Sequence, residues 1–263
     1  MGGAITAEAR WSGRFREDEL SQRIRWGVMQ AAPLFVDTRL EEIHRRLLKH
    51  YGRQPDREVW DPLKQFVYSL LSSRTKTETT HQVVRELEVR FGSWEGLRDA
   101  PAAEIEEAIG AITFPERKAV QLKRALQQIT ERCGALSLDF LSGYRTDKIR
   151  LWLERFEGVG SKTSAAVVNF STLRRRALCV DSHHLRVTER LGLVRKNADA
   201  RETEERLMEM APVEWSPVKL DEHHTLIKIH GQRTCTKHDP RCFACPLLDV
   251  CPAGQGSGGV RTG

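Results

Sequence analysis

Apolar residues recur at the spacing of a helix through most of this chain, whereas the period-two alternation of strands is nearly absent. In residues 62–71 they fall on one face, after Asp61, which can cap a helix, and Pro62, which suits its first position. Further helices are expected to start at Pro101, Pro115, Thr146, Ser161, Ser182, Asn197 and Pro217. The pattern predicts an all-α fold of about ten helices, which must pack together because helices this short are marginal alone.

Length and charge narrow the class of protein. The 263 residues suffice for one or two domains with a real core, and the net charge of +6 is modest. No apolar run reaches the roughly 18 residues of a membrane span, and no signal peptide is recognisable. We therefore expect a soluble, intracellular protein with no membrane partner. Residues 1–34 are interpreted as an N-terminal extension, and the Gly-rich residues 253–263 as a disordered tail.

Four of the six cysteines are concentrated near the end of the chain, at Cys235, Cys242, Cys245 and Cys251. In a compartment that keeps thiols reduced, this density indicates a metal site, since four thiolates complete a tetrahedral set. The spacing does not name the metal. Structural zinc sites usually show two close cysteine pairs, and only one close pair is present here, while iron-sulfur clusters also take four cysteines. The two others, Cys133 and Cys179, have largely apolar neighbours and are expected in the core.

A tight reversal between two helices is predicted at residues 157–160, which read Glu-Gly-Val-Gly. The unpaired N–H groups at the start of the second helix would form an anion site suited to a phosphate. Lys162 follows closely, and Asp181 lies nineteen residues further on. Taken singly, these features are equally typical of an ordinary connection, a solvated lysine and a helix cap. Their combination with the cysteine array indicates a functional site.

Together these motifs resemble the endonuclease III family, helix-hairpin-helix DNA glycosylases that carry a 4Fe-4S cluster. The resemblance rests on residues 156–164, on the Val-Asp-Ser-His run at 180–183, and on His230-Gly231 before the cysteines. It implies a helical barrel domain at 58–175 that contains the hairpin. It also implies an iron-sulfur cluster domain formed by 35–57 and 176–252, with the 4Fe-4S cluster on the four cysteines.

The resemblance further implies a partner and a reaction. The partner would be double-stranded DNA containing damaged bases or abasic sites, bound in the groove between the domains by a monomeric protein. The reaction would be excision of oxidised pyrimidines followed by β-elimination at the abasic site, which makes the chain a bifunctional glycosylase and lyase. Lys162 would attack C1′ of the extruded nucleotide. Asp181 would stabilise the positive charge that develops on the sugar and assist proton transfer. The expected location is the cytoplasm, in association with the nucleoid if the source is bacterial.

Further DNA contacts follow from the same resemblance. The amides of Gly158, Val159 and Gly160 would hold a backbone phosphate, and Lys237 and Arg241 would add phosphate contacts from the cysteine loop. His183, next to the catalytic aspartate, is also expected at the DNA.

Two positions depart from the family pattern. Arg74 stands where the family usually has a glutamine that fills the gap left by the extruded base, and Phe114 stands where a leucine inserts into the duplex. On sequence alone Phe114 fits the core as well as a wedge. These changes leave two alternatives open: a mismatch thymine glycosylase, and a DNA-damage-binding paralogue with little catalytic activity.

Overall fold

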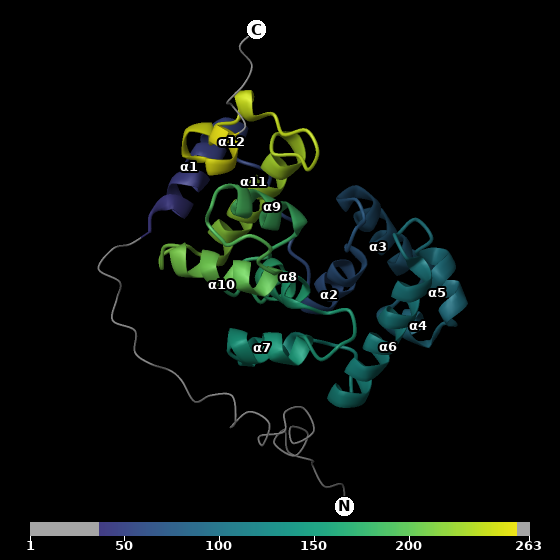
Figure 1. Ribbon diagram of the computed structural model, residues 1–263. Coiled ribbons are helices and arrows are strands. Elements are labelled where there is room, and N and C mark those ends of the chain that lie inside the picture. The colour runs from purple at the N-terminus through teal and green to yellow at the C-terminus, as the bar shows by residue number, and fades with distance from the viewer. Residues whose placement is uncertain (1–36, 257–263) are drawn as a thin grey trace, which may run out of the picture.

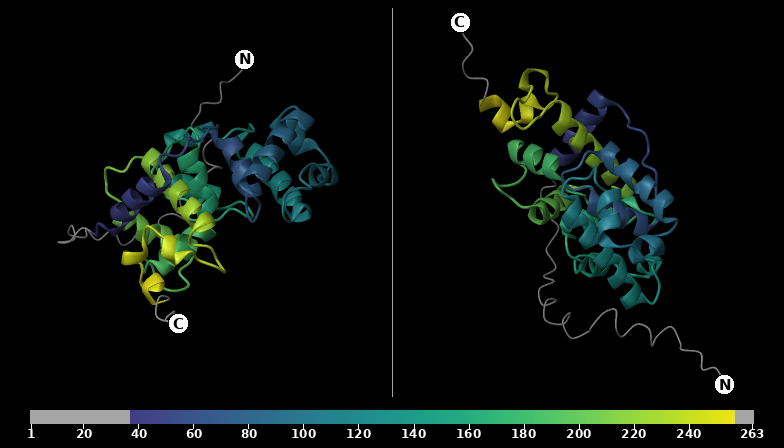
Figure 2. Two further views of the ribbon diagram at one scale, coloured as in Figure 1. Left: turned by 90° about the horizontal axis from the view of Figure 1, so that it is seen from above. Right: turned by 90° about the vertical axis from the view of Figure 1, so that its right-hand side faces the viewer.

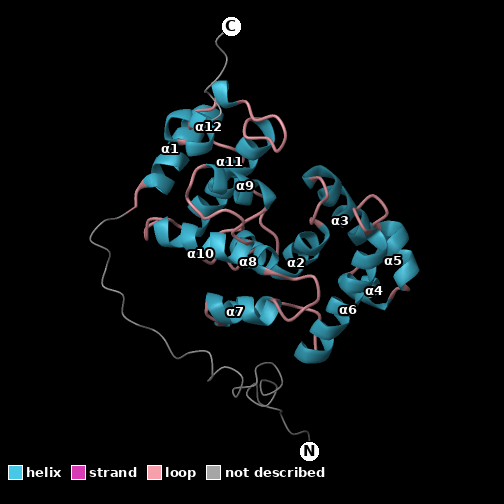
Figure 3. Ribbon diagram, viewed as in Figure 1, coloured by secondary structure: helices cyan, strands magenta, loops and turns pink. Residues whose placement is uncertain are grey.

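The computed structural model describes residues 37–256, and this part of the chain is helical (Figures 1 and 3). It contains no strand, and its one isolated bridge joins Trp60 and Ser171. The all-α prediction is therefore confirmed. The α-helices are α1 Arg39–Tyr51, α2 Pro62–Leu71, α3 Thr77–Phe91, α4 Trp94–Asp99, α5 Ala102–Ala108, α6 Pro115–Cys133, α7 Thr146–Leu153, α8 Ser161–Phe170, α9 Ser182–Arg190, α10 Ala200–Met210, α11 Pro217–Arg233 and α12 Pro252–Gly256.

Helix starts follow local sequence signals at most positions. At α2 the Asp61 carboxylate accepts hydrogen bonds from the backbone N–H groups of Leu63 and Lys64, at 2.9 and 3.0 Å, and Pro62 occupies the first turn. The start predicted at Asn197 is wrong by three residues. Asn197 has φ of +59°, which suits a turn, and Asp199 caps α10 instead by accepting from Glu202 N. The sequence also predicts that the helix starting at Thr146 ends at Gly158, but α7 ends at Leu153, because the chain has already entered the hairpin.

Two apolar cores organise the helices. The first draws on side chains between Trp60 and Ala177, and the second on residues 40–47 together with residues 178–247. The domain boundaries expected at 58 and 175 stay a prediction. In Figures 1 and 2, α3–α6 lie on one side of the molecule, while α1 and α9–α12 lie on the other. Helix α8 packs against α2 and α7 and also against α10 and α11, so it joins both groups.

Two expectations concerned the ends of the chain, an N-terminal extension and a disordered C-terminal tail. The predicted N-terminal extension, residues 1–34, lies outside the described residues, as do residues 257–263 of the expected disordered tail. The first four tail residues are helical instead, because α12 spans Pro252–Gly256 and packs against α9. Between residues 37 and 256, none of the helices combines the length and the apolar character that a membrane span needs.

Candidate functional site

The hairpin between α7 and α8 turns most sharply at Gly158. This residue has φ of +81°, and a Cβ added there would lie 3.0 Å from Gln121 Oε1, so glycine is required. Gly160 is extended and precedes α8 without a side-chain cap. The N–H groups in the first turn of α8 are thus available to an anion. Glu157 fixes the hairpin from outside, accepting from Gln121 Nε2 at 3.2 Å and from Arg124 at 3.0 Å.

Lys162 lies in this first turn of α8 and is half-buried. Its ammonium group donates to Ser72 Oγ at 3.2 Å, which ties it to the loop between α2 and α3. Behind it, the Cys179 thiol lies 3.6 Å from the Lys162 carbonyl oxygen. Burial raises the pKa of the Cys179 thiol to about 12, so this cysteine is a protonated core residue, as expected from the sequence.

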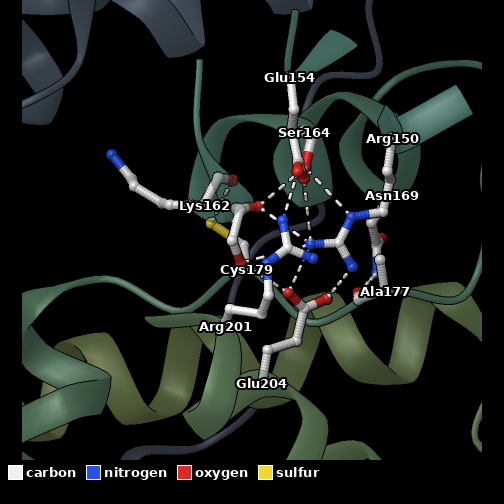
Figure 4. Close-up of polar contacts among 10 residues, drawn as sticks. Arg150, Glu154, Lys162, Ser164, Asn169, Ala177, Cys179, Arg201 and Glu204 are labelled. Carbon is white, nitrogen blue, oxygen red and sulfur yellow. Dashed lines mark hydrogen bonds and ion pairs between the residues drawn. The ribbon is translucent and has the colours of Figure 1, made fainter. Parts of the chain in front are cut away.

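A network of buried ion pairs holds the start of α8 from the side away from the Lys162 side chain (Figure 4). Arg150 of α7 donates two hydrogen bonds to Glu204 of α10, both at 2.6 Å, and their side chains are 16% and 4% exposed. Glu204 also accepts from the Ser161 hydroxyl at 2.9 Å, and Arg150 donates to the Ser161 carbonyl at 3.3 Å. Glu154, Ser164 and Arg201 extend the network. It positions the helix turn that carries Lys162.

Asp181 is the N-cap of α9 and is held rigidly. Its Oδ1 accepts from the backbone N–H groups of His183 and His184, at 2.8 and 3.0 Å, and from the His184 ring at 3.1 Å. The His184 ring is fully buried and stacks on His224 with 4.9 Å between centroids. Burial alone would raise the pKa of the Asp181 carboxyl, but the hydrogen bonds and charge of His184 outweigh it, so the pKa lies well below its usual range. Asp181 is therefore ionised at neutral pH, with Oδ2 left for a ligand.

Lys162 and Asp181 line one cleft of about 540 Å³. It lies between α2, α8 and the loop 72–77 on one side and α9 and α11 on the other. Four of the predicted site residues contribute to its walls: Arg74, Lys162, Asp181 and His183. The combination of a nucleophilic amine, an ionised carboxylate and an anion-binding helix terminus suits chemistry at a sugar carbon beside a phosphate.

Arg74 and Phe114 lie on two loops that are fastened together at the rim of the cleft. Both residues have positive φ, +59° and +60°, which is uncommon and costly for side chains of this size. Thr113 N donates to Thr75 Oγ1 at 3.1 Å, and the buried Lys118 donates to the carbonyls of Leu71 and Ser73, both at 2.7 Å. The Arg74 guanidinium lies 5.9 Å from the Phe114 ring centre, and Phe114 is 49% exposed. The alternative that Phe114 belongs to the core is wrong.

The four clustered cysteines line one cavity of about 140 Å³, and none forms a disulfide. Arg190 closes one side by donating to the carbonyls of Thr236 and Lys237, at 2.7 and 3.1 Å. Lys237 and Arg241, the predicted phosphate contacts, are exposed beside this cavity and do not line the cleft. Among residues 37–256, no three His, Cys, Asp or Glu side chains are arranged around a single metal ion. A four-iron cluster takes one thiolate at each iron, so its ligands surround a volume, as these four do.

Known proteins match this arrangement. Residues 67–213 match the family described as HhH-GPD superfamily base excision DNA repair protein. Endonuclease III of Bacillus subtilis is 30% identical over 74% of this chain and 83% of its own length. The chain belongs to the endonuclease III family. Endonuclease III of Thermotoga maritima is 28% identical over 84% of this chain and 97% of that protein. An Arabidopsis thaliana protein named as a putative DNA glycosylase is 31% identical, and the match covers 71% of this chain and 65% of the length of that relative.

Solved structures share the fold at lower identity. A trapped endonuclease III–DNA covalent intermediate superposes with a TM-score of 0.69 at 22% identity, over 85% of this chain and 99% of that one. A thermostable thymine-DNA glycosylase gives 0.65 at 20% identity, over 82% and 97%. The helix-hairpin-helix fold of the endonuclease III family is thereby confirmed, and the chain is a member of a family of DNA glycosylases.

Sequence reasoning missed several residues of this endonuclease III family site. Lys118 is a buried ammonium group within an otherwise amphipathic helix, and burial together with the charge of Lys162 lowers its pKa to about 8. Ser72 holds Lys162, and His184 holds Asp181. Lys228 of α11 lines the cleft as well. Only His184 had a local signal, since it lies three residues after the capping aspartate.

Proposed function

We propose that this chain is a bifunctional base excision repair enzyme. It removes oxidised pyrimidines from duplex DNA and then cleaves the abasic site by β-elimination. The observation that carries the proposal is the shared cleft of Lys162 and Asp181. There the amine donates to the Ser72 hydroxyl and pairs with no carboxylate among residues 37–256, and His184 holds the carboxylate ionised. The protein would act as a monomer on DNA in the cytoplasm.

In the proposed reaction, each residue of the site has a separate role. Lys162 Nζ attacks C1′ of the extruded nucleotide, the glycosidic bond breaks, and the base leaves with a proton. The covalent product rearranges to an imine on Lys162, which makes the C2′ proton acidic, and loss of that proton expels the 3′ phosphate. Asp181 stabilises the positive charge that develops at the sugar as the base departs. The amides of Gly158 and Gly160 hold a backbone phosphate and so fix the position of the sugar, whereas the Val159 N–H, which the sequence also predicted for this contact, already donates to the Phe156 carbonyl at 3.1 Å.

The four cysteines around their common cavity fit a 4Fe-4S cluster, which we propose as the cofactor. When bound, the cluster supplies a covalent framework for the surrounding loop. The chain's own exposed side chains, Lys237 and Arg241, would then contact DNA phosphates from this loop.

Borohydride trapping on a duplex with one abasic site tests the lysine directly. We expect a covalent adduct with the wild-type protein and none with Lys162→Ala, while Lys148→Ala, which changes a lysine outside the cleft, keeps the adduct. No adduct with the wild type, or an undiminished adduct in Lys162→Ala, would contradict the lyase assignment.

A mismatch thymine glycosylase is the second candidate, because Arg74 offers a guanidinium at the rim where the unpaired base would lie. Base release from a thymine-glycol duplex and a G·T duplex separates the two activities. A DNA-damage-binding paralogue would instead bind duplexes in a salt-sensitive manner and release no base from either.

A further inference from the structure

The cleft holds a second ammonium group besides that of Lys162. Lys228 of α11 is half-buried, lines the same cleft, and donates to Thr77 Oγ1 at 2.7 Å. Thr77 is the first residue of α3, so this hydrogen bond spans from the second core to the first. Burial lowers the pKa of Lys228, and the charge of Asp181 partly restores it.

The charges that line the cleft do not balance. Among the described residues, Asp181 is the only carboxylate in the cleft walls. The cationic side chains in these walls are Arg57, Arg74, Lys76, Lys162 and Lys228. Arg57 is neutralised by Asp221, at 3.0 Å, but within the described chain Lys162 and Lys228 are each held by a hydroxyl and not by a carboxylate. A ligand that fills the cleft must therefore supply hydrogen-bond acceptors.

The cleft wall that includes Lys228 also has a polar edge. The Phe170 ring in this wall is buried, since the Arg57 guanidinium covers it at 4.0 Å from its centre and the His224 ring packs against it at 5.2 Å between ring centres. Beside it, the Tyr68 hydroxyl reaches Thr77, so Tyr68, Thr77 and Lys228 form a continuous polar edge. The two hydroxyls can donate or accept, but an ammonium group only donates. The sugar phosphate has its own site at the hairpin, at the start of α8.

We propose that Lys228, anchored by Thr77, is a specificity-determining residue that donates a hydrogen bond to a carbonyl oxygen of the extruded base. The inference rests on the proposed glycosylase function and names its substrate class: 2,4-dioxopyrimidines, the thymine and uracil series, in preference to 4-aminopyrimidines, the cytosine series. The discriminating acceptor is the carbonyl oxygen at C4, because the C2 carbonyl is common to both series. At C4 a 4-aminopyrimidine instead turns its own donors toward the ammonium group, which leaves both donors without an acceptor there.

The test uses two duplexes that differ only at the 4-position of the lesion, 5-hydroxyuracil and 5-hydroxycytosine. We expect the wild-type protein to release 5-hydroxyuracil about tenfold to a hundredfold faster in single turnovers, the range for one lost hydrogen bond to a charged group. In Lys228→Met this ratio falls toward one, through slower release of 5-hydroxyuracil. Lys49→Met removes an exposed charge on α1 and leaves the ratio at its wild-type value.

Two further measurements separate base recognition from other roles of Lys228. Cleavage of a preformed abasic site needs no base, so Lys228→Met should keep the wild-type rate of borohydride trapping there. Thr77→Val should lower the 5-hydroxyuracil preference, and Thr77→Ser, which retains the hydroxyl, should restore it.

Three results would overturn the inference: equal wild-type rates on both lesions, an unchanged ratio in Lys228→Met, or an equal loss of abasic-site cleavage in that variant. An equal loss of abasic-site cleavage would mean that Lys228 contacts a DNA phosphate or supports folding. A wild-type protein that traps no abasic site and releases no base would instead contradict the proposed function, so the two failures are distinguishable.

Discussion

Removing Arg150 should unfold the protein more readily and also slow the reaction at Lys162. Arg150→Met leaves the Glu204 carboxylate, which is 4% exposed, without its bidentate partner. Within residues 37–256 the Ser161 hydroxyl is then its one remaining donor. It also removes the hydrogen bond to the Ser161 carbonyl, one residue before Lys162. The variant therefore acts on stability and on the position of the nucleophile through the same contacts.

The size of the effect follows from burial. Breaking one partner of a buried ion pair costs about 3 to 5 kcal/mol, because an unpaired charge stays in a poorly hydrated site. For a chain of this length each kcal/mol lowers the melting temperature by about 2 to 4 °C, so a loss of roughly 6 to 20 °C is expected. Arg150→Met/Glu204→Leu removes both charges and should recover most of that loss, since a pair replaced by apolar side chains is often neutral.

Urea unfolding followed by circular dichroism measures the free energies, and borohydride trapping measures the reaction of Lys162. Arg145→Met is the matched control, because that arginine precedes the same helix and its pair with Asp147 is exposed. The reasoning is refuted if Arg150→Met costs less than about 1 kcal/mol, as surface pairs do. It is equally refuted if the double variant is less stable than both single variants.

Three shorter predictions concern other parts of the chain. Burial, and then the charge of Lys219, lowers the pKa of His44 to about 4. The unfolded chain therefore binds a proton that the native state does not, and the free energy of unfolding should fall as the pH drops from about 6.5 to 4. This fall should be less steep in His44→Gln. If the free energy of unfolding depends on pH equally steeply in His44→Gln, this prediction is contradicted. Cys242→Ser should abolish the visible iron-sulfur absorption and lower the melting temperature; zinc without iron on elemental analysis would refute the cluster. Phe114→Ala should slow base release from duplex DNA about tenfold, since extrusion costs a few kcal/mol, and should spare a single-stranded lesion.

Local signals predicted the helices well where a capping side chain and a proline coincide, as at Asp61 with Pro62 and at Ser216 with Pro217. They failed at Asn197, because asparagine favours both a helix N-cap and a left-handed turn, and here it adopts the turn. The fold class therefore followed from the sequence, while several helix ends did not.

The functional site, too, was predicted from the sequence only in part. Lys162 and Asp181 were predicted because they belong to a motif with fixed order. Arg150 and Glu204 were not, since they are 54 residues apart and each looks like an ordinary surface charge on an amphipathic helix. Lys228 was missed for a related reason: its partner Thr77 lies 151 residues away, and only the folded chain shows that both face the cleft.

The pKa of Asp181 decides between two roles for this residue. A general base works best with a pKa near the operating pH, and the His184 hydrogen bond moves the carboxyl in the opposite direction, so it is a poor proton acceptor. In the proposed reaction its role would therefore be electrostatic, and it would matter most while positive charge develops on the sugar during base release. Asp181→Asn, which keeps a good helix cap, should slow base release about a hundredfold or more and abasic-site cleavage much less.

Because the pKa of Asp181 is lowered, its carboxylate becomes protonated only at a pH below the ordinary value of 3.8. Protonation of Asp181 should therefore cause no fall in the rate of base release between pH 5 and 8. His184→Gln weakens the hydrogen bond and should move this protonation to higher pH. Equal losses of base release and abasic-site cleavage in Asp181→Asn would assign the residue to proton transfer in both steps and refute an electrostatic role.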